Sequence, residues 1–119
     1  MNIVLVAACA LIDPDGRVSQ PPVVKNIALG VMPDATFKES SWSLSPGATA
    51  LVYTDGATDA RAPSGEMFGS AGLDRVVSAC VDQSPQQFVD DIAETIAAFG
   101  AGAAPEDDLT LLALKYVRV

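Results

Sequence analysis

The chain has 119 residues, half of them hydrophobic, and carries a formal net charge of −8. This size and composition predict one globular domain, residues 1–119, with a single core, and exclude a disordered chain. Only seven residues are Lys or Arg, so nucleic acid and anionic membranes are not expected partners, since both require clustered positive charge.

The first predicted element is a strand over residues 3–12. This apolar stretch is too short to span a bilayer, and it lacks the basic flank of a secretory signal. Residues 13–16, Asp-Pro-Asp-Gly, predict a turn, and residues 17–22 predict a short strand or loop at a sheet edge. Cys9 and Cys80 lie far apart in apolar stretches, as expected for reduced core thiols of a cytoplasmic protein.

The next part of the chain is expected to form a hairpin. Residues 23–31 are apolar and are expected to be partly buried. Residues 36–44 alternate in a weak strand pattern that places Trp42 inward. Residues 45–47, Ser-Pro-Gly, predict a turn into a strand at residues 49–54, which would pair with the preceding strand.

A loop and a first helix are predicted after this hairpin. Residues 61–69 are rich in Gly, Pro and Ser, and we expect them to form a loop that folds back onto the body through Met67 and Phe68. Residues 71–81 predict a helix with one apolar face, formed by Leu73, Val76, Val77 and Cys80.

A second helix is predicted to begin at Ser84, with Pro85 at the first helical position and Gln87 completing a capping box. Residues 109–119 predict a strand that is buried on both faces early in its course. The order of elements therefore predicts an α+β fold, in which an antiparallel β-sheet packs with a helix pair. The apolar face of the second helix is expected to contain Phe88, Ile92, Ile96 and Phe99, with Asp90, Asp91 and Glu94 facing solvent.

Two acidic clusters lie at the ends of predicted strands. Asp55, Gly56 and Asp59 come after the strand at residues 49–54, and Asp107 and Asp108 come just before the last strand. Carboxylates at strand ends beside a Gly are oxygen donors suited to a divalent cation. The alternative is that both clusters are solvated turns, because Asp-Gly is a common turn dipeptide.

Three ordered segments carry a resemblance to a known family. Residues 51–60 read LVYTDGATDA, residues 65–69 read GEMFG, and residues 106–114 read EDDLTLLAL. They resemble the back half of a PPM-type (type-2C) metal-dependent serine/threonine phosphatase, in the bacterial SpoIIE-like branch that acts in partner switching and sigma-factor control. The resemblance extends from about residue 27 to residue 116. It implies an α-β-β-α sandwich, of which this chain would form about half.

The resemblance also implies roles for the acidic residues. Asp55 and Asp107 match metal ligands of the family, so we expect their carboxyl groups to lie close together and to hold Mn²⁺ or Mg²⁺. Asp108 is expected to support the ligands or the backbone, and Asp59 to reach a peripheral ion through water. Gly56 is sufficiently explained by a tight turn. With no His in the chain, a His general base and His-ligated zinc are excluded here.

The sequence also departs from the family pattern. The family's first metal-binding Asp-Gly is not matched, and Ala8-Cys9-Ala10 occupies the place of an expected Ala-Gly-His segment. The chain therefore resembles a C-terminal fragment, a shortened relative or a degenerate copy. One functional hypothesis is a phosphatase acting on phosphoserine or phosphothreonine of a regulatory protein, with little or no activity in the isolated chain. The other is a non-catalytic module that binds a partner-switching regulator or forms a homodimer; a gene fragment without function is a third alternative.

Overall fold

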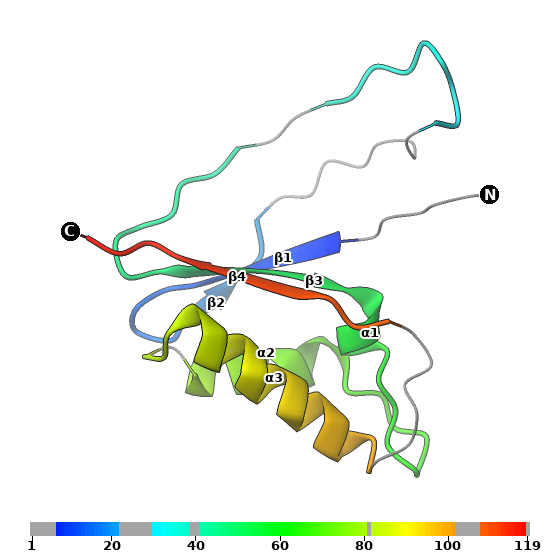
Figure 1. Cartoon of the computed structure of the whole chain (residues 1–119), viewed down its shortest axis with the longest axis vertical. Coiled ribbons are helices and arrows are strands. Elements are labelled where there is room, and N and C mark those ends of the chain that lie inside the picture. The colour runs from blue at the N-terminus through cyan, green and yellow to red at the C-terminus, as the bar shows by residue number, and fades with distance from the viewer. Residues whose placement is uncertain (1–6, 22–29, 39–40, 81, 102–107, 119) are drawn as a thin grey trace.

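The computed structural model describes residues 7–21, 30–38, 41–80, 82–101 and 108–118. These residues form a β-sheet with a pair of longer helices on one side (Figure 1). The α+β architecture predicted from the sequence is confirmed. In chain order the elements are β1 (Ala7–Ile12), β2 (Val18–Ser19), β3 (Thr49–Thr54), α1 (Asp55–Thr58), α2 (Gly69–Ala79), α3 (Pro85–Phe99) and β4 (Leu111–Lys115).

The sheet has four strands in the order β2-β1-β3-β4, and every neighbouring pair is antiparallel. In the β1–β3 register Ala7 lies opposite Thr54, and Ile12 lies opposite Thr49. In the β3–β4 register Tyr53 lies opposite Leu111. The strand β3 therefore lies inside the sheet, and its last residues lie at the end where β4 begins.

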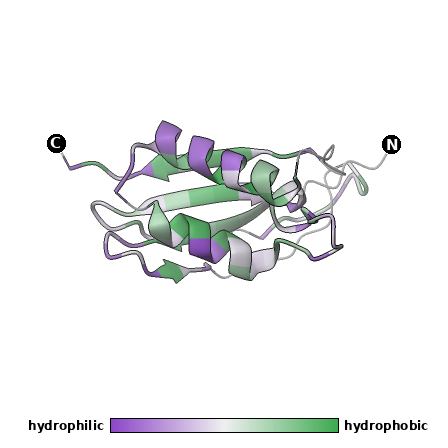
Figure 2. Ribbon diagram, turned by 90° about the horizontal axis from the view of Figure 1, so that it is seen from below, coloured by the Kyte–Doolittle hydropathy of each residue, from purple (hydrophilic) through white to green (hydrophobic). Residues whose placement is uncertain are grey.

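The core lies between the sheet and the helices α2 and α3. Alternate residues of β1 and β3 face the helices, because side chains on a strand point to opposite faces in turn. The two helices turn apolar residues toward the sheet and polar residues toward solvent (Figure 2). Burying a large apolar side chain stabilises a fold by about 1.5–3 kcal/mol. The buried set includes Ala10, Ile12, Leu51, Tyr53, Leu73, Val77, Phe88, Ile92 and Ile96.

The start of α3 confirms part of the predicted capping pattern. The hydroxyl of Ser84 accepts a hydrogen bond from the backbone N–H of Gln87 at 3.3 Å, and Pro85 occupies the first turn. The side-chain amide of Gln87, however, donates to Asp91 at 2.7 Å. Asp91 also accepts from the amide of Gln83 at 2.7 Å and is half-buried, so its predicted solvent-facing position is wrong. Asp90 and Glu94 are exposed, as predicted.

Several predicted boundaries are confirmed. The strand at residues 49–54 is found with the predicted bounds, and β2 is a short strand at the sheet edge. At the first predicted turn, the Gly16 N–H donates to the Asp13 carbonyl at 2.9 Å, and Gly16 has φ +89°. Residues 3–6 and 23–29 of the predicted elements lie outside the described residues.

The predicted hairpin is wrong. Residues 36–38 and 41–44 form no strand, and Trp42 is 42% exposed. β3 pairs instead with β1 and β4, whose apolar residues extend the core across the sheet. Val31 and Met67 are also exposed, contrary to expectation, whereas the neighbouring Phe68 is buried.

The last strand is half-buried on one face and exposed on the other. Leu112 and Leu114 are 62% and 64% exposed, so the prediction of a strand buried on both faces is wrong. The physical reason is that, among the described residues, α2 and α3 both lie on one side of the sheet (Figure 1). We call the other side the open face. The strand registers place on it Cys9, Leu11, Ala50, Val52, Leu112 and Leu114.

Candidate functional site

The first acidic segment follows β3 directly. Thr54 has extended backbone angles (φ −96°, ψ 169°), and Asp55 begins the one-turn helix α1. The Asp59 N–H closes this turn by donating to the Asp55 carbonyl at 2.8 Å. The side chains of Asp55 and Asp59 are exposed, so both carboxylates face solvent at this end of the sheet.

The second acidic segment meets the first through Thr54. The Thr54 hydroxyl accepts a hydrogen bond from the Thr110 backbone N–H at 3.0 Å and donates to the Asp108 carbonyl at 3.2 Å. The Thr54 N–H donates to the Thr110 carbonyl at 3.2 Å. These three bonds, which we call the Thr54 junction, join segments that are 54 residues apart in sequence.

Gly56 brings the two segments into direct backbone contact. A Cβ atom at this position would lie 2.4 Å from the Asp108 carbonyl oxygen and 2.9 Å from its carbon. Gly56 does not have a positive φ, unlike Gly16 and Gly47. The tight-turn interpretation of Gly56 is therefore replaced by a different one: glycine is needed here because another backbone approaches closely.

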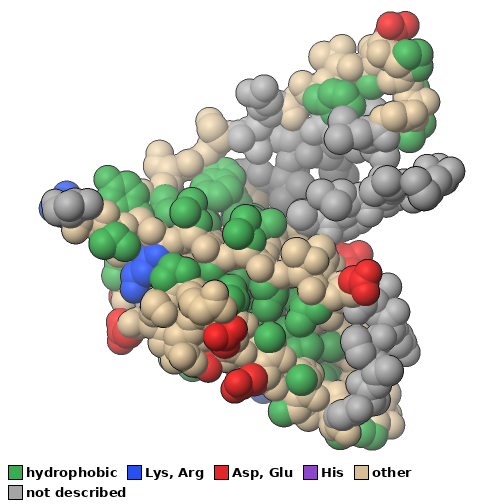
Figure 3. Space-filling model, in the orientation of Figure 1, with side chains coloured by type: hydrophobic (Ala, Val, Ile, Leu, Met, Phe, Trp, Pro, Cys, Tyr) green, Lys and Arg blue, Asp and Glu red, His purple; other side chains and the backbone are tan. Residues whose placement is uncertain are grey.

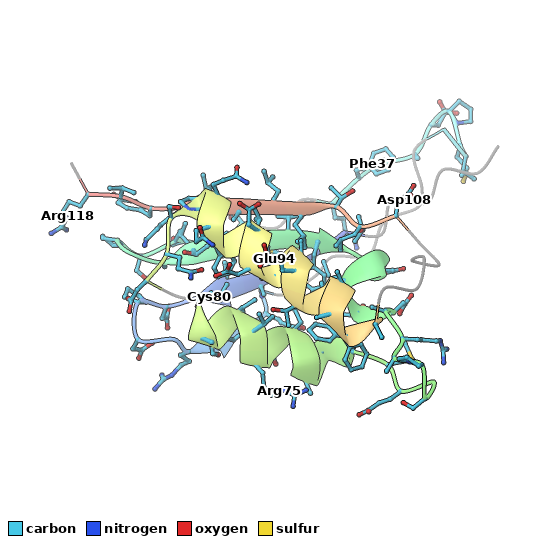
Figure 4. The ribbon with its side chains drawn as sticks, turned by 60° about the horizontal axis from the view of Figure 1, so that its bottom comes forward. Phe37, Arg75, Cys80, Glu94, Asp108 and Arg118 are labelled. Carbon is cyan, nitrogen blue, oxygen red and sulfur yellow. The ribbon has the colours of Figure 1, made fainter. Side chains whose placement is uncertain are left out.

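The structure brings together some of the predicted site residues. Asp108 is exposed, on the segment that leads into β4 (Figure 4). Asp107 lies outside the described residues, so the proximity of its carboxyl group to that of Asp55 stays a prediction. Among the residues that the structure describes, no group of three or more Asp, Glu, Cys or His side chains is placed to hold a metal ion.

The motif at residues 65–69 fixes the chain that follows α1. The Phe68 N–H donates to the Ala60 carbonyl at 2.7 Å, and Arg61 forms an antiparallel bridge with Met67. The buried Phe68 ring packs edge-to-face on Phe99 of α3, with ring centroids 5.2 Å apart. This motif therefore holds the segment after Asp59 against the helix pair.

The described groups with raised pKa values belong to the core and the sheet. Burial raises the pKa of Tyr53, and the charges of Asp74 and Cys9 raise it further. Burial also raises the pKa of the Cys9 and Cys80 thiols, and Asp91 adds to the effect at Cys80. Raised values favour the protonated, uncharged form of these groups.

Thr54 is the residue of the candidate site that sequence reasoning missed. The sequence pattern indicates the acids of both segments as candidate ligands. The hydrogen bonds that connect the two segments are formed instead by a hydroxyl and by backbone groups. The available signal was a Thr at the last position of a buried strand, directly before Asp-Gly. Thr110 acts through its backbone, so its side chain gave no such signal.

The antiparallel sheet with a helix pair on one side agrees with the half-sandwich that the resemblance to PPM-type phosphatases implies. The family model described as Stage II sporulation protein E (SpoIIE) matches residues 7–117. The chain belongs to this family.

Two similar proteins are longer than this chain. It is 34% identical over 87 residues to Protein IcfG of Synechocystis sp., a match that covers 73% of this chain and 14% of IcfG. Its fold is similar to the SiaA-PP2C domain of Pseudomonas aeruginosa, with a TM-score of 0.76 and 22% identity over 92% of this chain and 43% of that one. The chain thus spans less than half the length of each.

No helix in the described part of the chain has both the length and the hydropathy that a membrane span requires.

Proposed function

We propose that residues 1–119 form part of a single SpoIIE-like phosphatase domain that hydrolyses phosphoserine or phosphothreonine of a regulatory protein in partner switching. The observation that carries this proposal is the Thr54 junction, which joins the Asp55 segment to the segment of Asp107 and Asp108. Family membership supports the reaction class. Because the chain spans 43% of the solved domain, the activity is proposed for the whole domain.

The donor atoms at the junction suit Mn²⁺ or Mg²⁺. The side chains offered are carboxylates, the junction has no His or Cys, and all-oxygen ligation is typical of these two ions. Asp55 and Asp107 would hold the ion, and Asp59 would reach a peripheral ion through water. Such an ion lowers the pKa of bound water and neutralises charge on the phosphoryl oxygens.

The chain's own residues have positioning roles in this proposal. Thr54 fixes the end of β3 against the segment entering β4, so that Asp55 and Asp108 lie at the same end of the sheet. Gly56 allows the Asp108 backbone to approach, and Asp108 supports the turn into β4. Asp55 is exposed and therefore accessible to an ion and to a phosphorylated side chain.

Thermal unfolding with and without millimolar Mn²⁺ tests the metal site. An ion that binds only the folded state raises the melting temperature by mass action. We expect a modest rise in the wild type that is abolished by Asp55→Asn or Asp107→Asn. Asp34→Asn is the matched control, because it removes the same charge from an exposed residue far along the chain from both motifs. No rise in the wild type would mean that both clusters are solvated turns.

Turnover of p-nitrophenyl phosphate tests the catalytic part. We expect very low or no turnover by the isolated chain, because one metal-binding Asp-Gly of the family is not matched in it. Robust Mn²⁺-dependent turnover would contradict this expectation and would make Asp13 and Asp15 the first candidates for the replacing ligand.

A non-catalytic role is the second candidate function. The exposed Leu112 and Leu114 of the open face support it, because exposed apolar surface suits a protein partner or a homodimer. A domain that gains no stability from Mn²⁺ and still binds a partner-switching protein would favour this role. In either role we propose a cytoplasmic location, which suits the free thiols of Cys9 and Cys80.

A further inference from the structure

We infer that Phe68 and Phe99 are positioning residues of the candidate metal site. Their contact holds the acidic segment of Asp55 and Asp59 from the helix side, as the Thr54 junction holds it from the sheet side. We call the contact of the two rings the Phe68 clamp. The inference rests on the proposed function, because the ion at Asp55 is part of that proposal.

The Phe68 ring is enclosed by both long helices. It is 7% exposed and lies edge-to-face on Phe99, the last residue of α3, with an angle of 64° between the ring planes. It also lies against α2, where a Cβ atom at Gly72 would be 2.9 Å from the ring. Gly72 thus leaves the space that the ring occupies. An edge-to-face aromatic pair stabilises beyond the burial of its area, so the ring is held firmly by two elements.

Backbone hydrogen bonds connect Phe68 to the acidic turn. The Phe68 N–H donates to the carbonyl of Ala60, the residue directly after Asp59, at 2.7 Å. Residues 61–67 between them are closed by an antiparallel bridge. The Asp59 N–H in turn donates to the Asp55 carbonyl at 2.8 Å. A continuous series of backbone contacts therefore links the Phe68 ring to the turn that carries both acids.

The end of α3 also meets this loop through its backbone. A Cβ atom at Gly100 would lie 3.8 Å from the Arg61 carbonyl oxygen, so the two main chains are close. Figure 1 shows the loop after α1 beside the C-terminal end of α3. The Phe68 clamp is therefore part of a wider contact, in which the main chains beside the two rings also approach each other.

The carboxylates depend on this backbone for their position. Asp55 and Asp59 are exposed, and among the described residues no hydrogen bond or ion pair fixes either side chain. Figure 3 shows acidic side chains on the surface at the end of the sheet where α1 lies. Between the two acids, Ala57 is fully buried in the core. The turn is thus fixed at Thr54, Ala57 and Phe68, and groups behind metal ligands are what orients them.

Amide hydrogen exchange without metal tests the Phe68 clamp. Phe99→Ala should raise the exchange rate of the Asp59 N–H about fivefold to tenfold, because the loss of one aromatic contact makes local opening easier. The Tyr116 N–H, which donates to the Ala48 carbonyl at 3.0 Å at the opposite end of β3 and β4, is the internal reference. Phe99→Leu removes the ring with a smaller loss of volume and gives the same comparison if Phe99→Ala does not fold.

Two further variants separate positioning from general destabilisation. Val89→Ala shortens another half-buried side chain of α3 that packs on the core, and it should leave the ratio of Asp59 to Tyr116 exchange unchanged. Phe99→Tyr keeps the ring, and its hydroxyl can reach solvent because Phe99 is only half-buried. This conservative variant should therefore retain the wild-type ratio.

The dissociation constant for Mn²⁺ tests the consequence for the candidate site. It is obtained from the rise in melting temperature over a series of Mn²⁺ concentrations. Phe99→Ala should raise the constant roughly tenfold, as the loss of a group that supports metal ligands typically does. Phe99→Tyr and Val89→Ala should keep the wild-type value.

The outcomes distinguish a failed inference from a failed proposed function. An unchanged ratio of Asp59 to Tyr116 exchange in folded Phe99→Ala would overturn the inference, whatever the response to Mn²⁺. Faster Asp59 exchange with an unchanged Mn²⁺ dissociation constant would overturn the positioning role and leave a structural contact. A wild type without any response to Mn²⁺ would overturn the proposed metal site and the positioning role with it, while Asp59 exchange would still show whether the Phe68 clamp orders the turn.

Discussion

The backbone of Gly56 lies so close to the Asp108 carbonyl that a Cβ atom at position 56 would be 2.4 Å from its oxygen. The two residues belong to the two acidic segments, one after β3 and one before β4. Their contact leaves no space for any side chain other than hydrogen at position 56. The separation of the two segments is therefore fixed by the backbone and not by the acids themselves.

Gly56→Ala should consequently destabilise the fold. The added methyl group meets backbone atoms, which cannot move aside as a flexible side chain could, so we expect a loss of about 1–3 kcal/mol. Thermal unfolding measures it. Gly100→Ala is the matched control, because a Cβ at Gly100 would meet its nearest atom at an ordinary 3.6 Å. Equal melting temperatures for the two variants would contradict the proposed backbone contact.

Thr54→Val should weaken the junction. It removes the hydroxyl that accepts from the Thr110 N–H and donates to the Asp108 carbonyl. We expect a loss of about 1–2 kcal/mol in the free energy of unfolding, measured by urea denaturation. Thr54→Ser keeps the hydroxyl and should restore most of the loss. A serine variant as unstable as the valine variant would show that the methyl group, rather than the hydrogen bonds, is important.

The sequence predicted the elements whose local signals agree with their tertiary neighbours. Ser84 and Pro85 mark the start of α3, and Thr49 to Thr54 form a strand with alternate residues in the core. The prediction of a strand failed where the local pattern is not matched by pairing in the described sheet. The alternation around Trp42 indicates a strand, but the places beside β3 are occupied by β1 and β4.

The acidic residues of the candidate site could be predicted from the sequence. The contacts that connect its two segments could not. Asp55 and Asp108 could be singled out because carboxylates next to strand ends suit metal ions. The fit between Gly56 and Asp108 depends on the approach of two backbones, and a single sequence contains no signal for a distance between segments. Similarly, a single sequence contains no signal that Leu112 and Leu114 of β4 are exposed.

Asp91→Ala should destabilise the start of α3. Asp91 accepts hydrogen bonds from Gln83 and Gln87, both at 2.7 Å, and the other amide atom of Gln83, Oε1, is buried without a partner among the described residues. Bonds to a charged acceptor contribute about 1.5–3 kcal/mol when shielded, so we expect a loss of about 1–2 kcal/mol by urea denaturation. Asp90→Ala removes one exposed bond to Gln86 and should change stability by less than about 0.5 kcal/mol.

Alkaline pH should lower the stability of the wild type partly through Cys80. Burial and the charge of Asp91 raise the pKa of this thiol in the folded state. The folded state therefore retains the proton more strongly than the unfolded chain, in which the pKa is about 8.5. The contribution of Cys80 to the free energy of unfolding is fully present below the unfolded-state pKa of about 8.5. It is lost as the pH rises through the folded-state pKa. Urea denaturation from pH 7 to 10 should show a shallower decline for Cys80→Ala; parallel curves would contradict this role.

The order β2-β1-β3-β4 has a consequence for how the chain folds. β3 pairs with strands that are distant in sequence on both sides, and the Thr54 junction closes a separation of 54 residues. Long-range pairing of this kind gives a high contact order, which slows folding because loop entropy is lost before the contacts form. During synthesis α2 and α3 leave the ribosome before β4 does. The two acidic segments can therefore meet only after the helix pair is available, so the candidate site assembles late.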